Sequence, residues 1–82
     1  MVLSIKERVV NLVAVLFDID PEDFDEGSFL TDELGADPPG LEELSTHLAE
    51  EFGIEIPEEE YEVWETVGDV ITFVVERLRD EE

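Results

Sequence analysis

The 82-residue chain has no cysteine and very few basic residues. Without cysteine there can be no disulfide and no thiol chemistry, and cysteine usage gives no information about the redox compartment. Only four Lys and Arg residues stand against 25 Asp and Glu residues, which gives a formal net charge of -21. The four bases lie near the ends of the chain, at Lys6, Arg8, Arg77 and Arg79. Binding to nucleic acid is disfavoured, because phosphate contacts require basic side chains.

Long apolar segments are also missing. The longest run, residues 9–17, is interrupted by Asn11 and is too short to span a bilayer. The residues ahead of it lack the small-residue cleavage site of a signal peptide. We therefore expect one small cytoplasmic domain over residues 1–82, monomeric and without a membrane span.

The acidity has two explanations that composition does not separate. A strongly negative field steers a domain toward a basic patch on another protein. Alternatively, the acidic surface serves solubility or adaptation to high salt and carries no information about a partner. Both explanations stay open.

The first segment predicts a helix. Ser4 and Glu7 are spaced as a capping box, in which each side chain accepts from the other residue's backbone amide. An apolar face follows at three- and four-residue steps; it consists of Ile5, Val9, Leu12, Val13 and Leu16. The helix should end near Phe17, because the sequence that follows leads into Pro21.

Residues 18–31 are expected to form a long acidic loop that is attached to the core by Phe24, Phe29 and Leu30. Its acids at positions 18, 20, 22 and 25 are spaced somewhat like those of a calcium-binding loop. Such a loop needs glycine at its sixth position and glutamate at its twelfth. Asp23 occupies the first of these positions and Phe29 the second. We therefore predict a solvated loop and no metal site.

The central segment predicts a second long helix. Asp37 suits the N-cap, and Pro38 suits the first helical position, where a missing amide hydrogen costs nothing. Leu34, Gly35 and Ala36 are interpreted as the end of the preceding loop. The apolar stripe of the helix consists of Leu41, Leu44, Leu48 and Phe52. Gly53 is a candidate for its C-terminal cap.

Two further helices are expected in the last third of the chain. Residues 57–62 predict a short helix with proline at its start and acids in its first turn. Thr66 and Asp69 form a second capping pair ahead of the last helix. The buried face of that helix consists of Val67, Val70, Ile71, Val74 and Leu78. The pattern predicts an all-α domain with three longer helices and a short third one.

The centre of the sequence resembles the acyl carrier protein family. The matching pieces are Leu34-Gly35-Ala36-Asp37, Glu43-Leu44, Glu50-Glu51-Phe52 and residues 55–59. The resemblance implies an acyl-carrier-like four-helix bundle. In that family the residue after Leu-Gly-Ala-Asp is a serine that carries the phosphopantetheine arm. Here this residue is Pro38, followed by Pro39 and Gly40. Proline offers no hydroxyl, so no covalent cofactor is predicted.

The resemblance also implies a docking surface. The positions that present small or apolar side chains to partner enzymes in the family correspond to Pro39, Glu42 and Thr46. The attachment residue and its neighbours therefore differ together. We predict an acidic docking module for a basic surface of a fatty acid, polyketide or related biosynthetic enzyme. The candidate docking residues are Asp37, Glu42, Glu43, Thr46, Glu50 and Glu51.

An alternative reading keeps a genuine acyl carrier protein. Its arm would then be attached to Ser45, or its cargo would be held without a covalent bond. Against Ser45, hydroxyls in the middle of helices mostly bond to the backbone or to water. A third, less specific interpretation is an inactive paralogue that has kept no partner. An enzyme is not indicated, because the one histidine, His47, has no partners spaced for catalysis or for a metal site.

Overall fold

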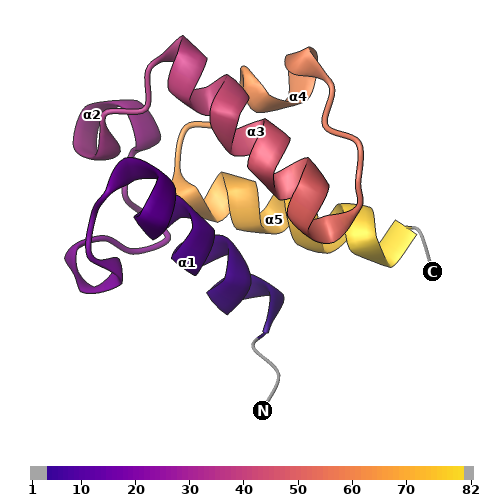
Figure 1. Ribbon diagram of the computed structural model, residues 1–82, viewed down its shortest axis with the longest axis horizontal. Helices are drawn as coiled ribbons and strands as arrows, with labels where there is room; N and C mark the ends of the chain where they lie inside the picture. Colours follow the sequence, from indigo (N-terminus) through magenta and orange to yellow (C-terminus); the bar gives the residue numbers. More distant parts are fainter. Residues whose placement is uncertain (1–3, 81–82) are drawn as a thin grey trace.

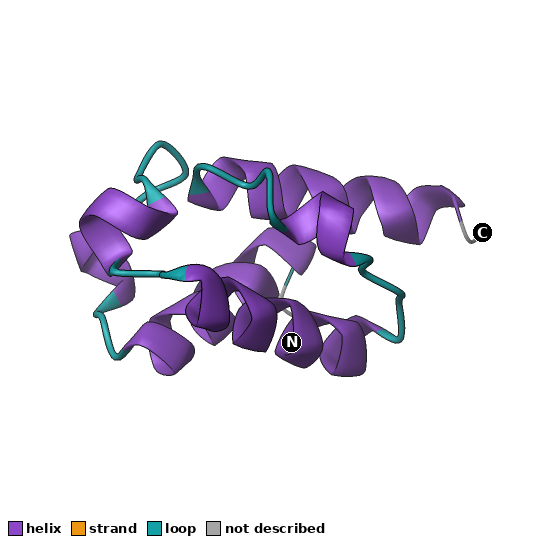
Figure 2. Ribbon diagram, turned by 90° about the horizontal axis from the view of Figure 1, so that it is seen from above, coloured by secondary structure: helices purple, strands orange, loops and turns teal. Residues whose placement is uncertain are grey.

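The computed structural model describes residues 4–80, which form a small all-helical domain (Figure 1). Its elements are α1 (Ile5–Phe17), the 3₁₀ turn η1 (Pro21–Asp23), α2 (Leu30–Leu34), α3 (Pro38–Phe52), α4 (Glu58–Tyr61) and α5 (Val67–Asp80). The three long helices and the short α4 between α3 and α5 confirm the predicted fold class. Figure 2 shows the loops that join these helices around the bundle.

Helix α1 begins and ends as the sequence predicts. The Ser4 hydroxyl accepts from the Glu7 amide at 3.1 Å, and the Glu7 carboxylate accepts from the Ser4 amide at 3.3 Å. The helix ends at Phe17, and the C-cap residue Asp18 has a left-handed φ of 54°. Val9 and Val13 are fully buried, whereas Leu12 and Leu16 are only half-buried. One side of α1 is therefore covered, and a strip of its apolar surface is not.

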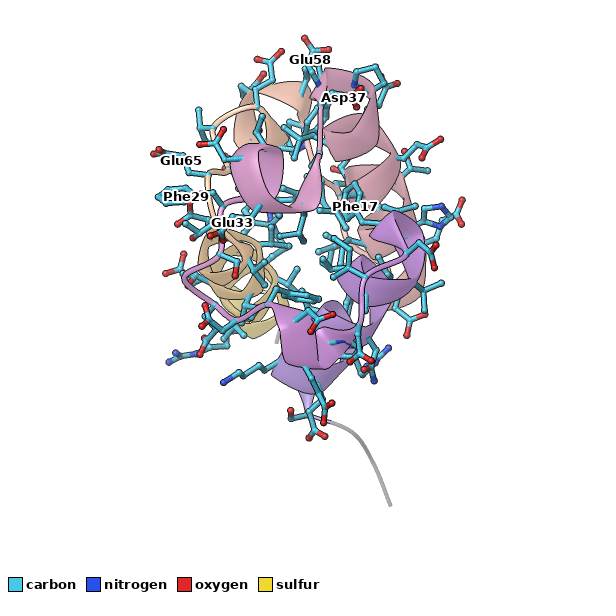
Figure 3. All side chains as sticks on the ribbon, turned by 90° about the vertical axis from the view of Figure 1, so that its left-hand side faces the viewer. Phe17, Phe29, Glu33, Asp37, Glu58 and Glu65 are labelled. Carbon is cyan, nitrogen blue, oxygen red and sulfur yellow. The ribbon has the colours of Figure 1, made fainter. Side chains whose placement is uncertain are left out.

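Helix α2 corrects the predicted first loop. Residues 30–34 are helical, so the expected loop over residues 18–31 is shorter, and Leu34 ends a helix. This one-turn helix is held by one hydrogen bond to a distant segment and by one within its own turn. The Leu30 amide donates to the Glu65 carbonyl at 2.8 Å, and the Glu33 carboxylate accepts from the Phe29 amide at 2.9 Å. Figure 3 shows Phe29, Glu33 and Glu65 together on one side of the molecule.

The expected anchors of that first loop behave differently from one another. Leu30 is fully buried and Phe24 is half-buried, as predicted. Phe29 is 47% exposed, so the prediction that it anchors the loop is wrong. Its backbone takes that role, because Phe29 forms an antiparallel bridge with Thr66.

Helix α3 also begins and ends as predicted. The Asp37 carboxylate accepts from the Gly40 amide at 2.9 Å, with Pro38 and Pro39 in the first turn. Gly53 ends the helix with a φ of 65°, a conformation in which glycine has no side-chain penalty. Leu44 and Leu48 are fully buried at the centre of its apolar stripe.

Helix α5 completes the bundle. Thr66 and Asp69 cap it reciprocally, since the Thr66 hydroxyl accepts from the Asp69 amide at 3.2 Å and the Asp69 carboxylate accepts from the Thr66 amide at 3.1 Å. Trp64 lies just ahead of α5, and its ring packs edge-on against Phe73, with centroids 5.5 Å apart. Long helices α1 and α3 pack against each other, and α1 also packs on α5.

The core is formed by apolar side chains of α1, α2, α3 and α5 and of the segments between them. Its buried members are Val9, Val13, Leu30, Leu34, Ala36, Leu41, Leu44, Leu48, Ile54, Trp64, Val67, Val70, Ile71 and Val74. No helix in the described part of the chain has the length and apolar character needed to cross a bilayer.

Candidate functional site

The exposed surface of α3 has two flanks. Each residue advances about 100° around a helix, which turns Pro38, Glu42 and Thr46 to one side of the buried stripe and His47 and Glu51 to the other. The first flank borders α4 in a groove lined by Pro38, Pro39, Leu41, Glu42, Glu58, Tyr61 and Glu62, which we call the acidic groove. The second flank borders α1 in a groove lined by Asn11, Leu12, Val15, Leu16, His47 and Glu51, which we call the apolar groove.

The first turn of α3 is closely packed. Pro38 is exposed at the first helical position, directly after the capping residue Asp37. A β-carbon at Gly40 would lie 3.3 Å from the Phe17 ring and 3.1 Å from the Asp37 carboxylate. Glycine at this position thus allows the end of α1 to approach the start of α3. Figure 3 labels Phe17 and Asp37 at this junction.

The acidic groove concentrates negative charge from two helices. Partial desolvation raises the pKa of the Tyr61 hydroxyl, and the charges of Glu42, Glu58 and Glu62 raise it further. Partial desolvation also raises the pKa of Glu62, followed by the charge of Glu58. A carboxylate with raised pKa is one whose charge is disfavoured by its surroundings. None of the lining residues is basic, so this groove would favour a positively charged group.

The predicted docking residues do not share one surface. Glu42 and Thr46 lie on the α4 flank, and the Thr46 hydroxyl donates to the Glu42 carbonyl at 3.0 Å. By the same helical spacing, Glu43 and Glu50 lie on the outward crest between the flanks, and both are exposed. Glu51 lies on the α1 flank, where its carboxylate pairs with Arg8 at 2.9 Å. The Asp37 carboxylate caps the helix.

Three residues of the acidic groove are absent from the prediction: Glu58, Tyr61 and Glu62. The signal was in the sequence, because residues 58–62 contain four glutamates and one tyrosine. In the sequence, the glutamates at the start of this segment predict only favourable charges in the first turn of a short helix. Their position opposite Glu42 depends on how α4 packs on α3, which local sequence does not specify.

Ser45 has an enclosed position. Its side chain is 5% exposed, and its hydroxyl donates to the Glu42 carbonyl at 2.7 Å. A hydroxyl in this position satisfies its own hydrogen bond inside the helix. An enzyme that transfers a group to this oxygen would first have to expose it.

The wall of the apolar groove is fixed by Arg8. Its guanidinium pairs with the Glu51 carboxylate at 2.9 Å and lies 4.4 Å from the centroid of the Phe52 ring. His47, the one histidine, is exposed on the same flank beside Glu51. Among the side chains of residues 4–79, no three acidic or histidine groups are placed as metal ligands would be.

The comparisons with known proteins agree with this fold. Residues 7–74 match the family described as "Phosphopantetheine attachment site". The chain is 43% identical to an "Acyl carrier protein" of Phenylobacterium zucineum over 75 residues, which cover 92% of this chain and 95% of the relative. It is 42% identical to an "Acyl carrier protein" of Caulobacter vibrioides over 74 residues, which cover 90% and 95%. Acyl carrier proteins are carriers and not enzymes. The chain belongs to the acyl carrier protein family.

Proposed function

We propose that this chain is a carrier-family domain without a covalent phosphopantetheine arm, which binds other proteins through its acidic surface. One observation carries the proposal: Pro38 occupies the first position of α3, directly after the Leu-Gly-Ala-Asp sequence, where the family has its serine. Transfer of the arm needs a hydroxyl oxygen, and proline has none. The enclosure of Ser45, at 5% exposure, supports the absence of an arm there as well.

The acidic groove supports the docking part of this proposal. Glu42 lies on α3, and Glu58 and Glu62 lie at the two ends of α4. After partial desolvation, their negative charges raise the pKa of Tyr61. A basic patch on a partner would relieve this repulsion and would be attracted from a distance. The partner is a fatty acid, polyketide or related biosynthetic enzyme with a basic surface. A cytoplasmic, monomeric state and the lack of a cofactor are parts of the same proposal.

A second candidate function is supported by the comparisons. The relatives that match over nine-tenths of this chain are named acyl carrier proteins, and this favours a genuine carrier. Such a carrier would need its arm on Ser45 or a cargo held without a covalent bond. The two candidates differ in one measurable property, the mass of the protein after exposure to a modifying enzyme.

The arm is tested by co-expression with a phosphopantetheinyl transferase and by intact mass spectrometry. We expect the natural chain to keep its unmodified mass. A gain of one phosphopantetheine group would overturn the no-arm proposal, and peptide mapping would place the group. The Ser45→Ala variant is the control for attachment at Ser45. The Pro38→Ser variant has a hydroxyl at the family's attachment position. If the transferase modifies this variant, the enzyme still recognises the rest of α3.

Docking is tested with a purified fatty acid biosynthetic enzyme that binds acyl carrier proteins. The triple variant Glu42→Lys, Glu58→Lys, Glu62→Lys reverses the acidic groove. A matched control, Glu22→Lys, Glu55→Lys, Glu76→Lys, makes the same charge change at exposed positions elsewhere. Each exposed pair contributes about 0.2–1 kcal/mol, so three reversals should weaken binding by about tenfold or more. Equal losses in the two triple variants would overturn docking through this groove.

A further inference from the structure

We propose that the apolar groove between α1 and α3 binds a cationic amphipathic helix of a partner protein, at a surface separate from the acidic groove. The site would accept apolar side chains along one face of that helix and Lys or Arg side chains at its margins. This inference does not depend on the proposed absence of the phosphopantetheine arm, and it adds a second contact surface to the domain.

The floor of this groove is apolar surface that the core does not use. Val15 is 82% exposed, the most exposed of the large apolar side chains in the described residues. Its neighbours Leu12 and Leu16 line the same groove and are half-buried. The inward side of α1 is already filled by Val9 and Val13, which are fully buried. The exposed Val15 side chain therefore contributes little to the stability of the fold, and it is available for contact with a partner.

The groove is an open depression on the surface, and its α3 wall is held in place. Its volume is about 500 Å³, which is room for several side chains. On the α3 side, the Glu51 carboxylate is held by the Arg8 guanidinium, which also donates to the Glu51 carbonyl at 3.4 Å. The same guanidinium stacks over the Phe52 ring. A wall fixed in this way loses little conformational freedom when a partner binds.

The surrounding charge identifies the occupant. Val15 also lines an adjoining groove with Asp18 and Asp20, so acids lie on both sides of the apolar strip. No Lys or Arg lines either groove; His47 lines the apolar groove on the α3 side, and Arg8 touches it only through its pair with Glu51. An amphipathic helix inserts apolar anchors at three- and four-residue steps. Basic residues beside those anchors would meet Asp18 and Asp20, which line the adjoining groove, whereas Glu51 on the other side is already paired with Arg8.

Other occupants fit this surface less well. A second copy of the chain would bring another net charge of -21 to the same acidic margins. An anionic membrane surface would be repelled for the same reason. A cationic helix is the partner whose charge and apolar face both match the groove.

The test uses the full chain and a labelled model peptide. The peptide is a helix of about 18 residues, long enough to be helical, with Leu at three- and four-residue steps and Lys elsewhere. Fluorescence anisotropy gives its affinity. A peptide of the same composition in scrambled order loses the apolar face, and a Leu/Glu peptide reverses the charge. We expect binding by the first peptide and binding at least about tenfold weaker by each of the other two.

Two variants of the protein locate the binding. Val15→Lys places a charge on the strip, and it should weaken binding by at least about tenfold, as the loss of a central anchor does. Val63→Lys makes the same chemical change at another exposed valine, 68% exposed, and should weaken binding by less than about twofold because it alters only the general field. Val15→Thr preserves the shape of the side chain and should give an intermediate loss.

Several outcomes would overturn the inference. Equal effects of Val15→Lys and Val63→Lys would show attraction to net charge alone. Equal binding of the ordered and scrambled peptides would exclude an amphipathic fit. Self-association that competes with the peptide in sedimentation experiments would make a second copy the occupant. The triple reversal of the acidic groove distinguishes the two proposals, because the ratio between the Val15→Lys and Val63→Lys affinities should persist in that background.

Discussion

The two flanks of α3 differ in the charges that surround their carboxylates. On the α1 side, Glu51 has a cationic partner, Arg8, at 2.9 Å, and it borders an apolar floor. On the α4 side, Glu42 faces Glu58 and Glu62 around Tyr61. One helix therefore presents a compensated, apolar surface and an uncompensated, negative surface. The first favours association through apolar burial, and the second favours fast, salt-sensitive association through charge.

The placement of the few bases explains this difference. Within the described residues, the two ion pairs are Lys6 with Glu26 and Arg8 with Glu51, each at 2.9 Å, and both bases belong to α1. Arg77 lies over the Phe73 ring on α5, with its guanidinium carbon 5.0 Å from the centroid. Residues 9–76 contain no Lys or Arg. The negative potential of the acidic groove is therefore not offset by any base from the middle of the chain.

The largest expected effect is a loss of stability from a change in the buried stripe of α3, which supports both flanks. Leu44 is fully buried at the centre of the α3 stripe, and Leu44→Ala should lower the free energy of unfolding by about 2–5 kcal/mol. Urea denaturation followed by circular dichroism measures the change. Glu43→Ala, at the neighbouring exposed position, should remain within about 0.5 kcal/mol of the natural chain. Similar losses in both variants would mean that α3 contributes little packing.

Removal of the N-cap of α3, beside the acidic groove, should cause the next largest loss of stability. The Asp37 carboxylate accepts from the Gly40 amide ahead of the groove, so Asp37→Ala should cost about 1 kcal/mol. Asp37→Asn preserves the capping oxygen and removes the charge, and it should retain most of the stability. The midpoint of urea denaturation measures both variants. If Asn and Ala were equally destabilising, charge at the helix N-terminus would matter more than the capping bond.

The parts of the fold that were predicted correctly are those specified by neighbouring residues. The bonds of Ser4 with Glu7 and of Asp37 with Gly40 span three positions, and the apolar stripe of α3 follows helical spacing. The αL residue Gly53 is also a local signal. These features depend on propensity and periodicity, which the sequence displays directly.

The parts that were missed depend on distant segments. Helix α2 is attached through the Leu30 amide to the Glu65 carbonyl, which is far away in the chain. The acidic groove forms because Glu58 and Glu62 are brought opposite Glu42. The exposure of Val15 depends on which side of α1 the other helices leave open. In each case packing decides the outcome, and local pattern does not encode it.

A smaller effect is expected on the compensated flank. Arg8→Gln removes the ion pair with Glu51 and the cation–π contact with Phe52. Because both contacts are partly exposed, the loss in stability should be about 0.5–1 kcal/mol. Arg8→Lys preserves the charge and loses the planar stacking, so the difference between these variants measures the ring contact. Thermal unfolding at low salt gives both values. Identical melting temperatures for both variants and the natural chain would show that Arg8 does not stabilise this wall.

The smallest expected effect is a gain in stability on the acidic flank. Partial desolvation, and then the charge of Glu58, raises the pKa of Glu62 above its ordinary value of 4.5. A raised carboxyl pKa means that the folded state holds the proton more tightly than the unfolded state does. The stability associated with this proton is therefore present below pH 4.5, and it is lost as the pH rises through the folded-state pKa.

Glu62→Gln removes the ionisable group, so the variant should be more stable than the natural chain near neutral pH, and the difference should shrink in acid. Urea denaturation at several pH values measures this, with Glu55→Gln, which removes one exposed charge outside the groove, as the matched control. A gain that was equal for both variants would mean that net charge alone is responsible, and that the glutamates of the acidic groove do not act on one another.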